Sequence, residues 1–203
     1  MSPPRMLLTQ LDRTLPADKL VLLAAAGADE LACLRPQQEV ADAAAGCALV
    51  QEFNAGSTAI GSDRLPRPVS GVATARYLCA QVSDSGPCAE TGPVLMVIAF
   101  DVPPALQAEV ERWYSEEHIP LLRRAPGWLR ARRYEVQAHG GGPRWTSIAL
   151  HELRDPAVLG SAERAYARAT PWRARLSCQP WFEAAGRFVY QRFPRQKEVK
   201  HAK

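Results

Sequence analysis

The chain has 203 residues, of which 47% are hydrophobic and 23% charged, and a formal net charge of +4 at pH 7. This length can bury a real core in one large or two small domains, and the composition is that of a soluble globular protein. The mild positive charge permits an anionic small ligand, but it falls short of the basic surface that binds nucleic acid, so we expect no nucleic-acid partner.

The five cysteines are odd in number and scattered, and none has C-x-x-C spacing. This pattern favours reduced thiols over a disulfide scaffold or a zinc site. The N-terminus has no signal-peptide layout, and no stretch approaches the roughly 18 apolar residues that span a membrane. We therefore expect a cytoplasmic protein without a membrane segment.

The first half of the chain reads as a weak β-α-β-β-α-β unit. Its apolar patterns predict a strand at 6–11, a helix at 17–26, hairpin strands at 31–40 and 48–53, and a closing strand at 75–82. Pro36 argues against an inner position in the sheet for the predicted strand at 31–40. The stretch 57–68 is too short and too rich in Gly and Pro to form a full second helix.

A stretch rich in turn formers, residues 83–93, separates the two halves. We expect a degenerate unit at 1–83, a linker at 84–92, a second unit at 93–194 and a flexible basic tail at 195–203. The same succession of strands and helices is then expected in both units.

The second half shows the β-α-β-β-α-β order clearly. Its segments are a strand at 94–100, a helix from 103 to about 122, strands at 128–137 and 144–153, a helix at 156–168 and a strand within 182–193. This order is the ferredoxin-like unit. The predicted fold class is α+β, with two tandem ferredoxin-like units.

Three motifs in the second half carry a family signal. They are Trp113-Tyr114-x-x-Glu117-His118-x-Pro120, then Pro126-Gly127 with a strand ending Arg132-Arg133-Tyr134, and the segment Ile148-Ala149-Leu150-His151-Glu152-Leu153. With these motifs, residues 93–193 resemble the EthD-like branch of the dimeric α+β barrel superfamily. The resemblance implies two units packed sheet against sheet around a cleft, here as a pseudo-dimer within one chain. Superfamily members include polyketide cyclases, cofactor-free monooxygenases, lactone isomerases and dehydratases.

His118 is the leading candidate for a catalytic acid or base, because imidazole titrates near neutral pH. Tyr114 lies four residues earlier on the same face of the expected helix, so the two side chains can meet. The alternative is structural, because a histidine near a helix C-terminus is favoured by the helix dipole. Both interpretations stay open at this point.

His151 is the second candidate for proton transfer. It shares one strand face with Ala149 and Leu153, while Ile148 and Leu150 point to the other face. We expect the larger aliphatic side chains to pack under the helices and His151 to face the interior of the barrel. A hydrogen-bonded strand histidine without a chemical role is the alternative.

The motifs favour Glu117, Arg133 and Tyr134 as supporting residues, with an ion pair from Glu117 to the arginine as part of the scaffold. Arg133 lies on the opposite strand face from Tyr134. Trp113 is either a core aromatic or part of an aromatic-lined pocket. No ligand set has the spacing of a metal site, so we expect neither a metal nor a cofactor.

These residues and the resemblance together predict a cofactor-free lyase or isomerase. It would move a proton on a small organic molecule, hydroxylated or aromatic, while an arginine stabilises negative charge on oxygen. Two alternatives remain: a non-catalytic small-ligand binding or accessory protein, and a cofactor-free monooxygenase. The expected partner is a small molecule, and exposed sheet edges also favour pairing into a homodimer.

Overall fold

Apolar runs form strands in the first half much as the sequence predicts. In a computed structural model of the protein, the described residues are 3–21, 28–37, 46–57, 65, 73–86 and 90–193. The first-half elements are β1 (Arg5–Leu11), α1 (Ala17–Val21), β2 (Glu30–Pro36), β3 (Ala48–Phe53) and β4 (Ala73–Asp84). The remainder of the predicted helix at 17–26, nearly all of the stretch 57–68 and the basic tail at 195–203 lie outside the described residues.

A long helical stretch joins two strands in the second half, as predicted. It connects β5 (Val94–Phe100) to β6 (Trp128–Gly140). Its successive parts are η1 (Pro104–Leu106), α2 (Gln107–Arg112), η2 (Trp113–His118) and α3 (Ile119–Leu122). The η2 part is π-helical, which the sequence pattern did not predict. Such wider turns are rare and are often found at functional sites.

The second predicted helix needs correction, whereas the last strand lies within its predicted range. After β7 (Ser147–Leu153) the chain forms four short helical pieces before β8 (Gly186–Arg192). These pieces are η3 (Pro156–Gly160), α4 (Ala162–Arg168), α5 (Pro171–Ser177) and α6 (Pro180–Glu183). Caps and prolines explain the breaks. Ser161 caps α4, Thr170 caps α5, and both α5 and α6 begin with proline.

The eight strands close into one antiparallel barrel. Within the first half the strand order is β4-β1-β3-β2, and within the second half it is β8-β5-β7-β6. Each half therefore has the same order. The halves are joined where β4 pairs with β6 and where β2 pairs with β8. These ladders pair the last strand of each half with the second strand of the other.

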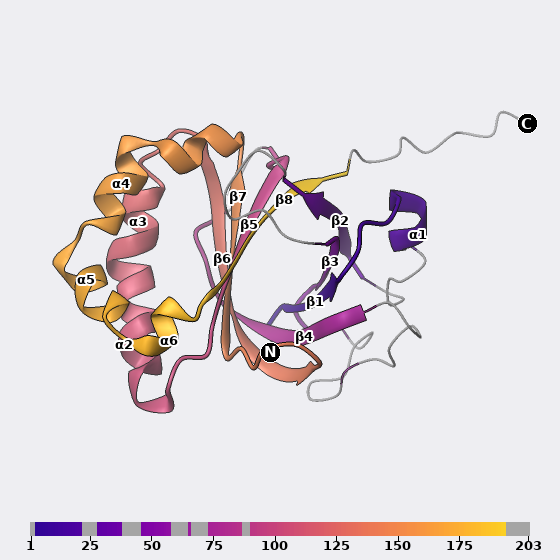
Figure 1. Cartoon of the computed structure of the whole chain (residues 1–203), viewed down its shortest axis with the longest axis horizontal. Coiled ribbons are helices and arrows are strands. Elements are labelled where there is room, and N and C mark those ends of the chain that lie inside the picture. The colour runs from indigo at the N-terminus through magenta and orange to yellow at the C-terminus, as the bar shows by residue number, and fades with distance from the viewer. Residues whose placement is uncertain are drawn as a thin grey trace, which may run out of the picture.

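Helices cover the outside of the barrel on the side of the second half. In Figure 1, α2 to α6 form a layer beyond β5, β6, β7 and β8, whereas α1 lies on the opposite side, beside β2 and β3. The helical layer is held by a cluster of buried apolar side chains that includes Val110, Trp113 and Ile119 from the helices and Phe100 and Ala149 from the sheet. This contact fixes the helices over the outer face of the sheet.

The interior of the barrel is filled by apolar side chains from both halves. Met6 and Leu8 of the first half meet Leu95, Ile148 and Leu150 of the second half in one cluster. Large aliphatic and aromatic side chains of both halves therefore meet inside the barrel, and the cleft that the resemblance implies between the halves stays a prediction. This packing also stabilises the closed barrel by removing apolar surface from water.

The two faces of β7 point in the opposite directions to those predicted. Ile148 and Leu150 face the packed barrel interior, while Ala149 and His151 face the helical layer. The alternation along the strand was correct, but both faces of this strand are buried. Hydrophobic size alone could not tell which face lies under the helices.

One end of the barrel interior holds a charged network. Arg132 of β6 forms salt bridges with Glu52 of β3 and Glu152 of β7. The hydroxyl of Tyr134 donates to Glu52, and Arg192 lies 3.5 Å from Glu152. The network joins the two halves through side chains, because Glu52 is the only one of these groups that comes from the first half.

Candidate functional site

The residues predicted for chemistry converge on a pocket between the helical layer and the outer face of the sheet. The pocket has a volume of about 160 Å³. Its lining comprises two histidines, four arginines, five aromatic side chains and three aliphatic ones, with no carboxylate. We call it the helix–sheet pocket. A cavity of this size suits a molecule of one or two rings better than a large ligand.

The π-helical turn positions His118 in this pocket. Trp113, five residues earlier, stacks on the imidazole with 4.3 Å between ring centroids. Tyr114 meets the same imidazole edge to face at 5.6 Å. The contact between Tyr114 and His118 predicted from helical spacing is confirmed. The wider turn of η2 adds the stacking of Trp113, since residues five apart come into line there.

His118 is neutral at physiological pH. Burial, followed by the charges of His151 and Arg173, lowers the pKa of this imidazole to about 3. A backbone hydrogen bond with Ala167 acts in the opposite direction. Its Nδ1 atom is buried and has no hydrogen-bond partner among the described residues. The site thus holds one buried imidazole nitrogen whose hydrogen-bonding capacity is unused, which is uncommon in folded proteins.

His151 is neutral as well, with a defined tautomer. The indole Nε1–H of Trp128 donates to Nδ1 of His151 at 3.2 Å, so the proton of the neutral ring sits on Nε2. Burial, followed by Arg133 and Arg164, lowers the pKa of His151 to about 3. Two neutral imidazoles therefore line one pocket.

Tyr114, which contacts His118, also forms a stacked pair with Arg133. The guanidinium of Arg133 lies 4.1 Å from the centroid of the Tyr114 ring. Burial is the main reason that the pKa of Tyr114 rises to about 12. Tyr114 consequently keeps its proton and is able to donate it in a hydrogen bond.

The expected ion pair between Glu117 and Arg133 does not form. Arg133 instead forms a salt bridge with Glu111 and donates to Ser147 Oγ at 3.0 Å. Glu117 accepts a hydrogen bond of 2.8 Å from Thr170. Thr170 is the N-cap residue of α5, so Glu117 contacts the start of that helix.

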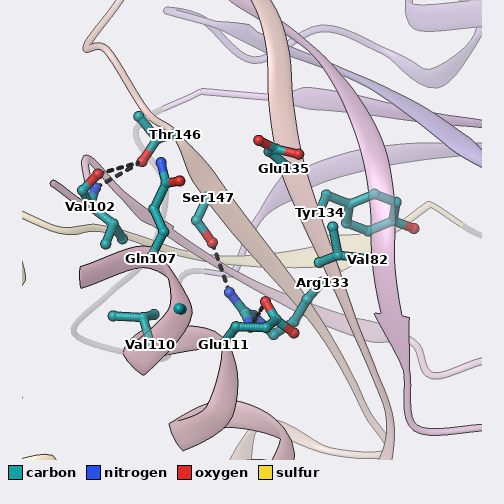
Figure 2. Close-up of a pocket in the computed structure, with 11 residues that line it drawn as sticks. Val82, Val102, Gln107, Val110, Glu111, Arg133, Tyr134, Glu135, Thr146 and Ser147 are labelled. Carbon is teal, nitrogen blue, oxygen red and sulfur yellow. Dashed lines mark hydrogen bonds and ion pairs between the residues drawn. The ribbon is translucent and has the colours of Figure 1, made fainter. Parts of the chain in front are cut away.

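A second hollow lies near the start of α2. Its volume is about 250 Å³, and Figure 2 shows Arg133 within it, reaching Glu111 and Ser147. Glu111 and Glu135 give this hollow an acidic lining, while Val102 and Val110 supply apolar surface. Arg133 lines this hollow and also contributes charge to His151 in the helix–sheet pocket.

The structure separates the predicted site residues into two groups. His118, Tyr114, His151 and Trp113 all line the helix–sheet pocket. Glu117, Arg133 and Tyr134 do not line it, and the Tyr134 hydroxyl belongs to the network inside the barrel.

Sequence reasoning missed four arginines that line the pocket. The arginines are Arg164, Arg168, Arg173 and Arg187. The spacing of Arg164 and Arg168 places both on one face of α4, which was the available signal.

No protein-family model and no curated protein matches the sequence of the chain. Solved structures do match its fold. An anthrone oxidase-like protein is 12% identical with a TM-score of 0.62, over 96% of this chain and 94% of that chain. A ferredoxin-fold protein from Listeria monocytogenes, related to antibiotic biosynthesis monooxygenases, is 11% identical with a TM-score of 0.59, over 97% of both chains. LmHde, a heme-degrading enzyme from Listeria monocytogenes, is 9% identical with a TM-score of 0.56, over 94% of this chain and 99% of that chain.

The chain shares the ferredoxin-like fold of these solved structures, and this part of the prediction is confirmed. At these identities the likeness concerns the fold alone. In the part of the chain that the structure describes, no helix is long and apolar enough to cross a membrane. Within the same residues, no cluster of three or more His, Cys, Asp or Glu side chains forms a metal-ligand set.

Proposed function

We propose that the protein is an enzyme that moves a proton on a small aromatic molecule carrying an acidic group. The observation that carries this proposal is the buried, unpartnered Nδ1 of His118 in a pocket lined by aromatic rings and arginines. Such a nitrogen accepts a proton, the rings pack against an aromatic ligand, and the arginines favour an anion. The reaction class is that of a lyase or isomerase that needs no cofactor.

The neutral state of His118 suits a base that acts only when the ligand is present. In the free protein its low pKa makes it a weak base. An anion bound nearby favours the protonated imidazole and raises this pKa. His118 then removes a proton from a carbon next to a carbonyl group. Return of the proton to another carbon gives isomerisation, and loss of hydroxide from a neighbouring carbon gives dehydration.

The other pocket residues stabilise the charge that develops on the carbonyl oxygen. Tyr114 stays protonated and donates a hydrogen bond to that oxygen, and an arginine supplies positive charge. His151 presents its Nε2–H as a second donor, because Trp128 occupies Nδ1. Trp113 holds the ring of His118 by stacking, so it positions the base.

We also propose that the halves are tandem copies of one unit, with boundaries at 1–83 and 93–194, and that the second copy belongs to the EthD-like branch. The repeated strand order and the reciprocal pairing of β4 with β6 and of β2 with β8 support the duplication. The Trp113-to-Pro120 motif supports the branch. A pseudo-dimer of this kind would carry one helix–sheet pocket with histidines, since the first half has no histidine.

Cofactor-free oxygenation is the second candidate function. Two of the neighbours are named as an anthrone oxidase-like protein and as a relative of antibiotic biosynthesis monooxygenases. The same proton removal would generate a carbanion or phenolate that dioxygen can oxidise. A third possibility, ligand binding without chemistry, uses the same aromatic and cationic lining.

Phenylpyruvate tests the proposal, because it combines one ring, a carboxylate and an acidic methylene group. We expect the protein to accelerate exchange of the methylene protons with D₂O, measured by proton NMR under nitrogen. His118→Ala should lower the rate by about 10²- to 10⁴-fold, while circular dichroism shows an intact fold. His139→Ala is the matched control, since His139 is exposed and outside the pocket.

The same samples separate the three functions. Dioxygen uptake that depends on His118 would favour oxygenation. Quenching of tryptophan fluorescence without any proton exchange would favour a binding protein. Equal exchange rates for the parent, His118→Ala and His139→Ala would contradict the role of His118.

A further inference from the structure

Four arginines line the helix–sheet pocket from three separate elements. Arg164 and Arg168 come from α4, Arg173 from α5 and Arg187 from β8. Helices α4 and α5 are short and are capped by Ser161 and Thr170, so the breaks at these caps help to bring the arginines together.

Backbone carbonyl groups hold three of these guanidinium groups in place. Arg164 donates to the carbonyl of Leu159, and Arg173 donates to the carbonyl of Arg168 at 2.9 Å. Arg187 donates to the carbonyls of Phe182 and Ala185, at 2.8 Å and 3.1 Å. These bonds orient the charges but do not neutralise them, because a carbonyl group carries no net charge.

Three of these four arginines have no carboxylate partner among the described residues. They are Arg168, Arg173 and Arg187. Arg173 shows the consequence: burial, and then Arg168, Arg187 and Arg164, lower the pKa of its guanidinium. Mutual repulsion of this kind disfavours the free state and is relieved when an anion binds.

An aromatic side chain lies beneath two of the arginines. The guanidinium groups of Arg173 and Arg187 lie 5.4 Å and 5.9 Å from the centroid of the Phe182 ring. Both also contribute positive charge at Tyr114, which lines the same pocket. The positive groups are thus close to the aromatic lining, so one ligand can contact both.

We propose that these arginines bind a dianionic head group, and that the ligand of the helix–sheet pocket is an aromatic dicarboxylate or aromatic phosphate monoester. The inference deepens the proposed function, because it names the substrate class of the same pocket. Guanidinium groups recognise carboxylate and phosphate oxygens through paired hydrogen bonds. With several uncompensated cations, a second negative charge on the ligand adds attraction that a monoanion cannot supply.

Three one-ring probes test the charge requirement: benzoate, phthalate and phenyl phosphate. Binding is measured by quenching of tryptophan fluorescence and by isothermal titration calorimetry, at constant ionic strength. We expect phthalate or phenyl phosphate to bind at least ten times more tightly than benzoate. The tighter of the two identifies the head group as a dicarboxylate or a phosphate. Equal affinity for benzoate and both dianions would overturn the proposal, as would no binding of either dianion.

Variants assign the binding to the cluster. Arg173→Gln and Arg168→Gln should each weaken binding of the preferred dianion at least tenfold and change benzoate binding less than threefold. Arg168 is exposed, so its replacement leaves the fold intact even if Arg173→Gln disturbs it. Arg175→Gln is the matched control. Arg175 lies on α5, as Arg173 does, but it pairs with Glu109 and does not line the pocket. Loss of binding in Arg175→Gln equal to that in the cluster variants would also overturn the proposal.

His118→Ala distinguishes this inference from the proposed reaction. The variant should keep dianion binding within about threefold, even when it loses proton exchange on phenylpyruvate. Tight dianion binding by a protein that never exchanges protons would refute the reaction and leave the head-group assignment standing. Proton exchange without any preference for dianions would refute the head-group assignment and leave the proposed reaction standing.

Discussion

Arginines in two neighbouring regions of the molecule have opposite surroundings. Inside the barrel, Arg132 is 3% exposed and lies between the carboxylates of Glu52 and Glu152. In the helix–sheet pocket outside the barrel, Arg173 of α5 and Arg187 of β8 are held by backbone carbonyls and have no salt bridge among the described residues. The paired arginine belongs to the scaffold, whereas the uncompensated ones have charge available for a ligand.

The comparison also explains why the two halves differ in chemistry. The first half supplies Glu52 to the interior network, which ties it to the second half. The helix–sheet pocket is lined by second-half residues alone. One half therefore contributes to closure of the barrel, while the other also carries the candidate site.

The largest expected effect on stability comes from removing the salt bridges of Arg132 inside the barrel. Arg132→Met leaves the half-buried Glu52 without its cation and the buried Glu152 with Arg192 alone, so we expect the free energy of unfolding to fall by about 3–5 kcal/mol. Urea unfolding followed by circular dichroism measures this loss. Arg154→Met is the control, since its ion pair with Glu90 is exposed and removal should lower the free energy by less than about 1 kcal/mol. Equal losses in the two variants would contradict the scaffold role of Arg132.

A pH-dependent loss of stability is the next largest effect. Folding lowers the pKa of His151 from its ordinary 6.5 to about 3. Below pH 6.5 the unfolded chain binds a proton that the folded chain does not, so stability falls as the pH falls. The expected slope is up to about 1.4 kcal/mol per pH unit for this residue, between pH 6.5 and 3.

Replacement of His151 measures that slope. Urea unfolding at pH 7.5, 6 and 5 should show a shallower pH dependence in His151→Gln than in the parent protein, whereas His139→Gln should match the parent. Parallel pH profiles for all three proteins would mean that His151 does not titrate abnormally on folding.

The smallest expected effect on stability comes from replacing Arg173 in the helix–sheet pocket. Arg173→Gln removes one member of a repelling cluster, so we expect the free energy of unfolding to change by no more than about 0.5 kcal/mol. The same variant should lose most of the thermal stabilisation that the preferred dianion gives to the parent. A loss of stability above about 2 kcal/mol in the absence of ligand would instead identify Arg173 as structural.

Much of the fold could be predicted because local patterns agree with it. The apolar run at 94–100 forms β5 at those residues, and the run at 48–53 forms β3. The repeated strand order also follows from the chain order of elements. Helix α5 was missed because Thr170-Pro171 was not interpreted as a helix start, although a capping threonine before proline is such a signal.

The site was predicted only where it is local in sequence. Trp113, Tyr114 and His118 lie within one helical stretch, so their spacing brought them together. The face occupied by His151 depends on which side of β7 the helices cover, and the arginines come from elements separated by caps. Both depend on tertiary packing, which single-strand periodicity does not encode.

Histidine NMR tests the central claim most directly. Long-range ¹H–¹⁵N correlation spectra at pH 7 report the protonation state of each imidazole, with His118→Ala used to assign the signals. We predict a neutral His118 in the free protein and a protonated His118 when the preferred aromatic dianion is bound, while His139 stays unchanged. A His118 signal that is the same in the free protein and in the saturated complex would contradict the account.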